Sequence, residues 1–177
     1  MFTKLTPYDF LELRPYFDSQ AHRLCYYSLS SFICWSHEFS YPVWRTGHDI
    51  LLVMMKYRDN PSRDYLYLPI ARGQYLAPEV LKDIAIKCGV RSFRHVPEDY
   101  VFAFGQNELE TLFNLRECED FYDYVYKTED LATLKGKKYS KKRNLIHQFL
   151  KSHVDQGRVD VHPFTASDIP ECLEFLA

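Results

Sequence analysis

The sequence is poor in glycine. It has six glycines in 177 residues, and no two of them stand close together. Loops that cradle nucleotide phosphates use several closely spaced glycines, so the sequence excludes a P-loop and a dinucleotide-binding fingerprint. It also lacks a G-x-S-x-G turn, which excludes the nucleophile elbow of the serine hydrolases.

Residues at metal-site spacing are scarce as well. Cys34-x-x-His37 is the one metal-like pair, and no second pair stands at the spacing of a zinc finger. We therefore expect no metal site. As nucleophile and base the two residues would need a third orienting group, so we favour a buried Cys34 packing as a small hydrophobe. The five cysteines, an odd number without framework spacing, fit free thiols in a reducing cytosol.

Long hydrophobic runs are also missing. The longest unbroken apolar run, Ile50–Met55, is far too short to span a bilayer. The first ten residues do not show the basic and apolar regions of a secretory signal, so we expect a cytoplasmic protein. Because the net charge is −2, any affinity for nucleic acid or membranes has to come from a local patch.

What is present predicts helices and strands in alternation. Thr6 caps a helix that has Pro7 and Asp9 in its first turn, and Pro15 is expected to end or bend that helix. The run 24–35 is apolar enough for a buried helix. The predicted strands are 43–46, 49–57, 64–70 with an edge or bulge at Pro69, 91–96 and 122–126; the further predicted helices are 78–87, one from Pro97, 128–136 and 138–153.

The end of the sequence repeats its opening. Phe164-Thr165 with Asp168 matches Leu5-Thr6 with Asp9, and a predicted strand at 159–161 precedes it. Any capped helix start can show this pattern. We favour a second copy of one structural unit, and because Ala177 falls inside that unit's first helix we expect a longer protein.

Charge is distributed in two opposite blocks. Ten acidic residues lie between Glu98 and Asp130, whereas residues 135–151 hold seven basic residues and no acid. Cations at the start of a helix oppose its dipole, so an anionic partner would explain this placement. A solvated face paired with the acidic block explains it equally well. Within the acidic block, Glu117, Glu119, Asp120 and Asp123 form either a carboxylate cluster or, as we prefer, a solvated loop.

The basic block supplies the candidate binding residues. Tyr139 lies among its lysines, where it would stack on a base or anchor the helix to the core. The candidates for binding donor phosphates or nucleic acid are Lys137, Lys138, Tyr139, Lys141, Lys142, Arg143 and Asn144. The sequence names no catalytic residue.

The segments 124–126 and 128–144 with Phe149 resemble bacterial proteins related to the C-terminal catalytic region of phosphatidylglycerol lysyltransferase. Ser31-Phe32, Trp35 and the strand at 49–52 fit the same pattern. The resemblance covers most of the chain and is most specific over residues 122–150.

Members of that family resemble two GNAT-like acyl-CoA N-acyltransferase units in tandem. The resemblance implies an α/β (α+β) fold with a central mixed, largely antiparallel sheet flanked by helices. It also implies a first domain at 1–155, which includes a basic linker helix at 137–153, and the start of a second, truncated domain at 158–177.

The resemblance further implies transfer of an acyl or aminoacyl group to an amine or hydroxyl. The expected donor is aminoacyl-tRNA or acyl-coenzyme A, although the spaced glycines of an acyl-CoA loop are absent from these 177 residues. Fold alone does not establish chemistry, so a non-catalytic GNAT-like scaffold or binding module is the alternative, with Tyr26, Tyr27, Trp35 and Trp44 as contact anchors. A third interpretation is contact of the same lysines with an anionic membrane surface.

Overall fold

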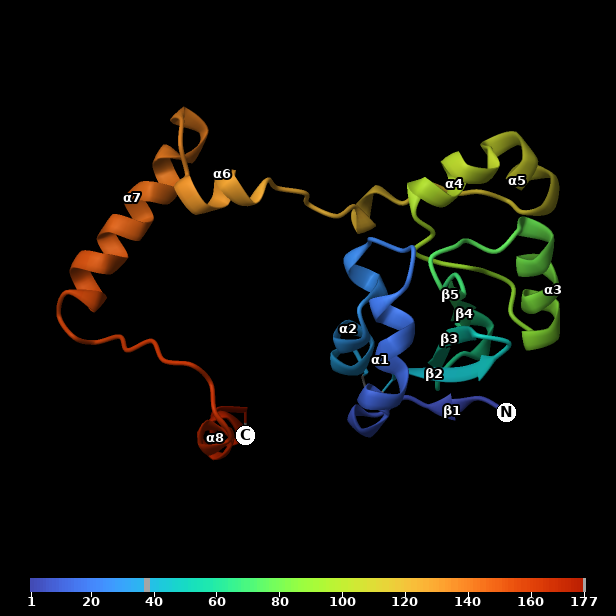
Figure 1. Ribbon diagram of the computed structural model, residues 1–177, viewed down its shortest axis with the longest axis horizontal. Helices are drawn as coiled ribbons and strands as arrows, with labels where there is room; N and C mark the ends of the chain where they lie inside the picture. The colour runs from blue at the N-terminus through green and yellow to red at the C-terminus, as the bar shows by residue number, and fades with distance from the viewer. Residues whose placement is uncertain (37–38, 177) are drawn as a thin grey trace. The chain divides into compact units, whose positions relative to one another are not determined.

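The computed structural model describes residues 1–36 and 39–176. Contacts divide the chain into an N-terminal unit, Met1–Asp123, and a C-terminal unit, Tyr124–Ala177, which are described separately (Figure 1).

An antiparallel sheet forms the centre of the N-terminal unit. Its strands are β1 (Thr3–Lys4), β2 (Ser40–Gly47), β3 (Ile50–Tyr57), β4 (Tyr65–Leu66) and β5 (Ile70–Ala71). They lie in the order β1-β2-β3-β4, and β5 also pairs with β3. The strands predicted at 43–46 and 49–57 are confirmed and form a hairpin, since β2 and β3 pair from Ser40↔Tyr57 to Gly47↔Ile50. His48 and Asp49 form its turn with φ of 53° and 60°, the left-handed geometry that a two-residue hairpin requires.

Helices cover both faces of this sheet. Alternate residues of β2 and β3 point to opposite sides, so Trp44 and Val53 join the core with Leu13 of α1 (Phe10–Asp18) and Phe32 of α2 (Leu29–Cys34). On the other face, Val43, Met54 and Leu66 pack against α3 (Pro78–Cys88) (Figure 1). Two further helices, α4 (Glu98–Phe104) and α5 (Gln106–Leu112), contribute Tyr100 and Leu109 to the first core.

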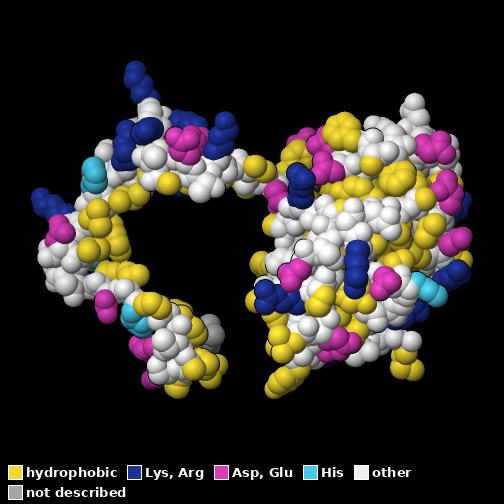
Figure 2. Space-filling view, viewed as in Figure 1, with side chains coloured by type: hydrophobic (Ala, Val, Ile, Leu, Met, Phe, Trp, Pro, Cys, Tyr) yellow, Lys and Arg dark blue, Asp and Glu magenta, His cyan; other side chains and the backbone are white. Residues whose placement is uncertain are grey.

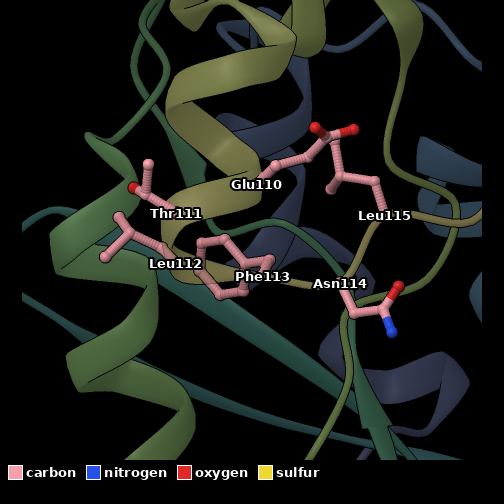
Figure 3. A pocket seen from close by; sticks show the side chains of 6 residues that line it. All are labelled: Glu110, Thr111, Leu112, Phe113, Asn114 and Leu115. Carbon is pink, nitrogen blue, oxygen red and sulfur yellow. The ribbon is translucent and has the colours of Figure 1, made fainter.

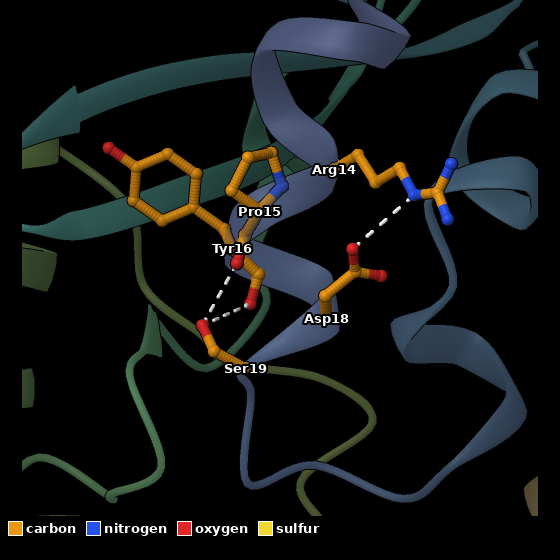
Figure 4. Close-up of polar contacts among 5 residues, drawn as sticks. All are labelled: Arg14, Pro15, Tyr16, Asp18 and Ser19. Carbon is orange, nitrogen blue, oxygen red and sulfur yellow. Dashed lines mark hydrogen bonds and ion pairs between the residues drawn. The ribbon is translucent and has the colours of Figure 1, made fainter.

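The first helix begins as predicted but does not end at Pro15. The Asp9 carboxylate accepts hydrogen bonds from the Thr6 N–H at 2.7 Å and the Thr6 hydroxyl at 2.9 Å. Pro15 lies inside α1 on its exposed side, where water can reach the carbonyl group of Leu11 that the missing N–H leaves unbonded. The helix continues to Asp18, and the Ser19 hydroxyl caps it by donating to the Pro15 carbonyl at 2.9 Å (Figure 4).

The strand predicted at 64–70 is broken in two. Tyr67 still donates to the Val53 carbonyl of β3 at 3.0 Å, but the ladder is interrupted after it, because the Leu68 N–H donates to the Tyr27 hydroxyl at 3.0 Å and Pro69 has no N–H. The flanking pieces, β4 and β5, are buried on both sides.

Two other strand predictions are wrong. The segment 91–96 makes only an isolated parallel bridge between Leu66 and Phe93, because Leu66 donates to Ser92 and accepts from Arg94 while the flanking residues turn away from a ladder. The segment 122–126 has no regular structure. Tyr124 and Val125 are almost fully exposed, so no sheet is present there to receive their alternating pattern.

The described helices of the C-terminal unit begin near the predicted positions. They are α6 (Thr128–Thr133), a 3-10 turn at Lys137–Tyr139, α7 (Ser140–Phe149), a π-helical turn at Leu150–Val154, and α8 (Ile169–Leu176). The segment 159–161, predicted as a strand, is irregular, since the described part of the C-terminal unit contains no strand that could pair with it. None of the helices in the described part of the chain has the length and apolarity of a membrane span.

The fold class predicted from the sequence is therefore confirmed as a mixed α/β fold with a largely antiparallel sheet flanked by helices. The domain limits at 155 and 158 and the GNAT-like assignment stay predictions.

Candidate functional site

The predicted basic site forms a continuous turn and helix in the C-terminal unit. Its residues occupy the 3-10 turn and the first half of α7. Leu134 and Gly136 both have positive φ, 47° and 93°, and reverse the chain between α6 and α7. Figure 2 shows dark blue Lys and Arg side chains gathered on the part of this unit that contains the turn.

Arg143 stabilises this turn. Its guanidinium donates to the carbonyl groups of Leu134 and of Gly136, the latter at 2.9 Å. Both bonds come from Nη1; the Leu134 carbonyl lies at the C-terminal end of α6, and the Gly136 carbonyl also accepts from the Tyr139 N–H at 3.3 Å. Arg143 therefore holds α6 and α7 together, a role that could not be predicted from the sequence alone.

Lys138 forms an ion pair with Asp130, a residue of the acidic block. Its Nζ lies 3.1 Å from Asp130 Oδ2, and the Tyr139 hydroxyl donates to the same oxygen at 3.5 Å. The hydrogen bond to Asp130 and then that to Tyr139 raise the pKa of the Lys138 ammonium. The paired-surface interpretation of the basic block thus holds for Lys138, and Tyr139 is half-buried beside it.

The remaining candidates stay open to solvent. Lys137, Lys141, Lys142 and Asn144 are exposed on the 3-10 turn and the first half of α7. Backbone N–H groups at the start of a helix and cationic side chains both suit phosphate oxygens. These four residues form the accessible part of the predicted binding site.

A second cluster, which the sequence did not indicate, surrounds His95 in the N-terminal unit. The imidazole stacks on Tyr26 with ring centroids 4.1 Å apart and on Tyr67 at 5.3 Å, while Phe121 meets it edge-on at 5.0 Å. Its backbone has a φ of 55°, which is unfavourable for a residue with a side chain. Strained residues often mark functional positions.

His95 is neutral at physiological pH. Burial and then the charge of Arg94 lower its pKa to about 4. Its Nε2 lies 3.5 Å from the Tyr65 hydroxyl, and Nδ1 is buried without a hydrogen-bond partner among the described residues. Burial also raises the pKa of Tyr65 and of Tyr67, whose hydroxyl groups lie 3.2 Å apart. The cluster therefore holds neutral donors and acceptors rather than charges.

The acidic segment does not form a carboxylate cluster. Asp123 binds Cys25, with Oδ2 accepting from the backbone N–H at 2.9 Å and Oδ1 from the thiol at 2.8 Å. Glu117 accepts from the Tyr122 hydroxyl. No group of three or more potential metal ligands occurs among the described residues. The bond to Asp123 raises the pKa of the Cys25 thiol, which makes this exposed thiol less nucleophilic.

The comparison with known families settles the resemblance. The family described as phosphatidylglycerol lysyltransferase, C-terminal, matches residues 17–177. The chain belongs to this family. No curated protein and no solved structure matches the chain.

The phosphatidylglycerol lysyltransferase C-terminal match includes both clusters. His95 and its aromatic neighbours lie inside the matched residues, as do Lys137 to Asn144. The positive φ of His95 and the stacking of its ring on Tyr26 and Tyr67 are consequences of tertiary packing. One sequence could therefore not indicate the His95 cluster.

Other residues singled out in this family member have structural roles. Tyr27 and Trp44 are buried in the core, so they are not surface anchors, whereas Trp35 is exposed and Tyr26 packs on His95. Cys34 is exposed, contrary to the buried role expected for it, because it ends α2 on the side away from Leu29 and Phe32. His37 lies outside the described residues.

An open cavity of about 430 Å³ lies at the end of α5. One continuous segment lines it, Glu110–Leu115 (Figure 3). Glu110 is its only ionisable side chain, so the cavity offers no pair of groups for acid–base or nucleophilic catalysis.

Proposed function

We propose that this chain is part of an acyl- or aminoacyltransferase that moves its group from a phosphate-bearing donor to an amine or hydroxyl acceptor. The observation that carries the proposal is the family match over residues 17–177. The acceptor attacks the carbonyl carbon of the donor's ester or thioester. The bond to the donor's oxygen or sulfur breaks, and the acceptor's proton passes to that leaving group.

The exposed basic residues support a role in donor binding. Lys137, Lys141 and Lys142 would contact the donor's phosphates, and Asn144 would hydrogen-bond beside them. Holding the donor in place supplies the positional part of catalysis. Aminoacyl-tRNA is the donor that we favour over acyl-coenzyme A, because its phosphates continue past the reach of one lysine and can engage the whole turn.

Charge reversal at two lysines tests this function. Lys141→Glu with Lys142→Glu is expected to weaken tRNA binding at least tenfold and to reduce the slope of log affinity against log salt by about 1.4–1.8, or 0.7–0.9 for each lost phosphate contact. Fluorescence anisotropy with labelled bulk tRNA over a salt series measures both quantities. Acyl-coenzyme A as competitor tests the other donor.

The matched control carries the same charge change elsewhere. Lys82→Glu with Lys87→Glu reverses two exposed lysines of α3. If both double variants bind tRNA equally well, the basic block is a solvated surface and the proposed donor site is wrong.

A further inference from the structure

One face of the N-terminal sheet is only partly covered. The residues on this side alternate along the strands and include Lys4, Tyr41, Val43, Arg45, Leu52, Met54 and Lys56. Helix α3 covers Val43 and Met54 through Ile84 and Cys88. The strand ends beside this contact carry the cationic and aromatic side chains.

Three cations of this face are held against aromatic rings. Arg45 lies over the Phe2 ring, with its guanidinium carbon 4.9 Å from the centroid. Lys4 and Arg58 both lie over the Tyr41 ring, at 5.6 Å and 5.3 Å. Stacking of this kind restricts the side chains while their remaining N–H groups stay free to bind an anion.

The net charge of the face is positive. Its strand positions include four basic residues, Lys4, Arg45, Lys56 and, just past β3, Arg58, and no acid. The nearby Asp64 pairs with Lys56 at 2.9 Å and also accepts from the Tyr57 N–H. Lys4, Arg45 and Arg58 make no ion pair among the described residues.

Phe39 adds an exposed ring to the same face. It stands two residues before Tyr41, and its carbonyl accepts from the Arg58 N–H at 3.0 Å, so the pairing of β2 and β3 continues to this position. Its side chain is 69% exposed. Its ring is therefore open to stack on a ligand.

We propose that this face, defined by Phe2, Lys4, Phe39, Tyr41, Arg45 and Arg58, binds single-stranded RNA. Aromatic rings interleaved with cations on an open surface suit a strand whose bases stack and whose phosphates pair with cations. The seven residues from Phe39 to Arg45 extend about 20 Å in the direction of β2, which is too long for one phosphate and fits several nucleotides. The identity of this RNA as the unpaired end of a donor tRNA rests on the proposed function.

Two kinds of substitution separate stacking from charge. Phe39→Ala is expected to weaken binding of a labelled 20-nucleotide oligouridylate at least about fivefold with an unchanged salt slope, because a base–aromatic stack carries no charge. Lys4→Glu with Arg58→Glu is expected to lower that slope by about 1.4. Fluorescence anisotropy of the labelled oligouridylate, titrated with the chain over a salt series, measures the affinity and the salt slope. The thermal unfolding midpoint checks that each variant folds.

Matched controls use exposed residues other than the six that define this face. Phe102→Ala removes an exposed ring of α4, and Lys82→Glu with Lys87→Glu reverses two charges on α3. These variants are expected to bind the oligouridylate as the unmodified chain does. Affinity equal to that of the controls in folded Phe39→Ala overturns the proposal, as does tighter binding of duplex RNA than of oligouridylate.

The two proposed binding sites can be tested independently of each other. If reversal of Lys141 and Lys142 weakens tRNA binding while both variants of the sheet face bind oligouridylate normally, the donor site stands and the sheet-face proposal is wrong. If the sheet-face variants alone lose affinity, the sheet-face proposal stands and the donor site is wrong.

Discussion

The N-terminal and C-terminal units differ in where their large apolar side chains lie. In the N-terminal unit, Leu51, Leu66 and Ile70 are 0% exposed. In the C-terminal unit, no described side chain is buried, and the apolar residues of α7 lie open, with Leu145 55% exposed. Figure 2 shows the corresponding yellow surface along one side of this unit.

The difference separates two sources of structure. Packing of distant residues around a sheet determines the N-terminal unit. The described C-terminal helices depend instead on local devices, such as the Arg143 bonds at the α6–α7 turn and the Asp168 bonds before α8. A helix as short as α7 is marginally stable alone, because helix initiation is costly.

Truncation of a leucine in each unit gives the largest expected contrast. Leu51→Ala is expected to lower the free energy of unfolding by about 2–5 kcal/mol, since it leaves a cavity in the core. Leu145→Ala is expected to change it by less than about 0.5 kcal/mol, because the side chain is exposed and alanine favours a helix. Urea unfolding followed by circular dichroism measures both. An equal loss in Leu145→Ala would break the comparison by showing that α7 buries this residue.

The sequence was most informative where local chemistry decides the structure. Thr6 with Asp9, the turn after Gly47 and the start of the helix at Pro78 were all predicted, because capping, turn and proline preferences act over a few residues. The strand at 64–70 was predicted as one piece because the Tyr27 hydroxyl that takes the Leu68 N–H is 41 residues away along the chain. Pattern alone cannot supply such a partner.

The candidate site also has features that the sequence predicts and features that depend on the folded chain. The run of lysines from 137 to 142 is visible in the sequence, and its helix was predicted. The structural roles of Arg143 and Lys138 were not, because they depend on how the chain turns at Leu134 and Gly136. The His95 cluster brings together residues from four separate segments, and no spacing in one sequence encodes that arrangement.

Acid is expected to act mainly on the N-terminal unit. The unfolded chain binds a proton at His95 near pH 6.5, whereas the folded chain binds it only near a pKa of about 4. The folded state, which keeps His95 neutral, is therefore at its full stability above about pH 6.5. The free energy of unfolding then decreases as the pH falls through about 4, because protons bind the unfolded chain more tightly. The partly exposed ring limits the effect to about 1–2 kcal/mol. Urea midpoints over this range measure it.

Variants of two histidines sharpen this result. His95→Asn tolerates the positive φ and is expected to flatten the pH profile, although His22, whose pKa burial also lowers, retains part of the slope. His147→Asn, at an exposed position of α7, is the matched control and is expected to keep the original profile. An unchanged profile in His95→Asn would mean that His95 does not carry the acid sensitivity.

The two helix caps give the smallest and most direct comparison. Asp168 Oδ2 accepts from the Thr165 N–H at 2.6 Å and from its hydroxyl at 2.9 Å, which reproduces the bonds of Asp9 to Thr6. Asp9→Ala is expected to cost about 0.5–2 kcal/mol of global stability, because α1 buries Leu13 in the core. Asp168→Ala is expected to speed amide exchange in α8 and to leave the global urea midpoint unchanged.

The same pair of variants shows how far cooperativity extends. A helix with local stability only exchanges its amides without unfolding the rest of the protein. If Asp168→Ala lowers the global midpoint as much as Asp9→Ala does, α8 unfolds together with the sheet. The two identical caps would then stabilise one cooperative structure, and the contrast between the units would be limited to side-chain exposure.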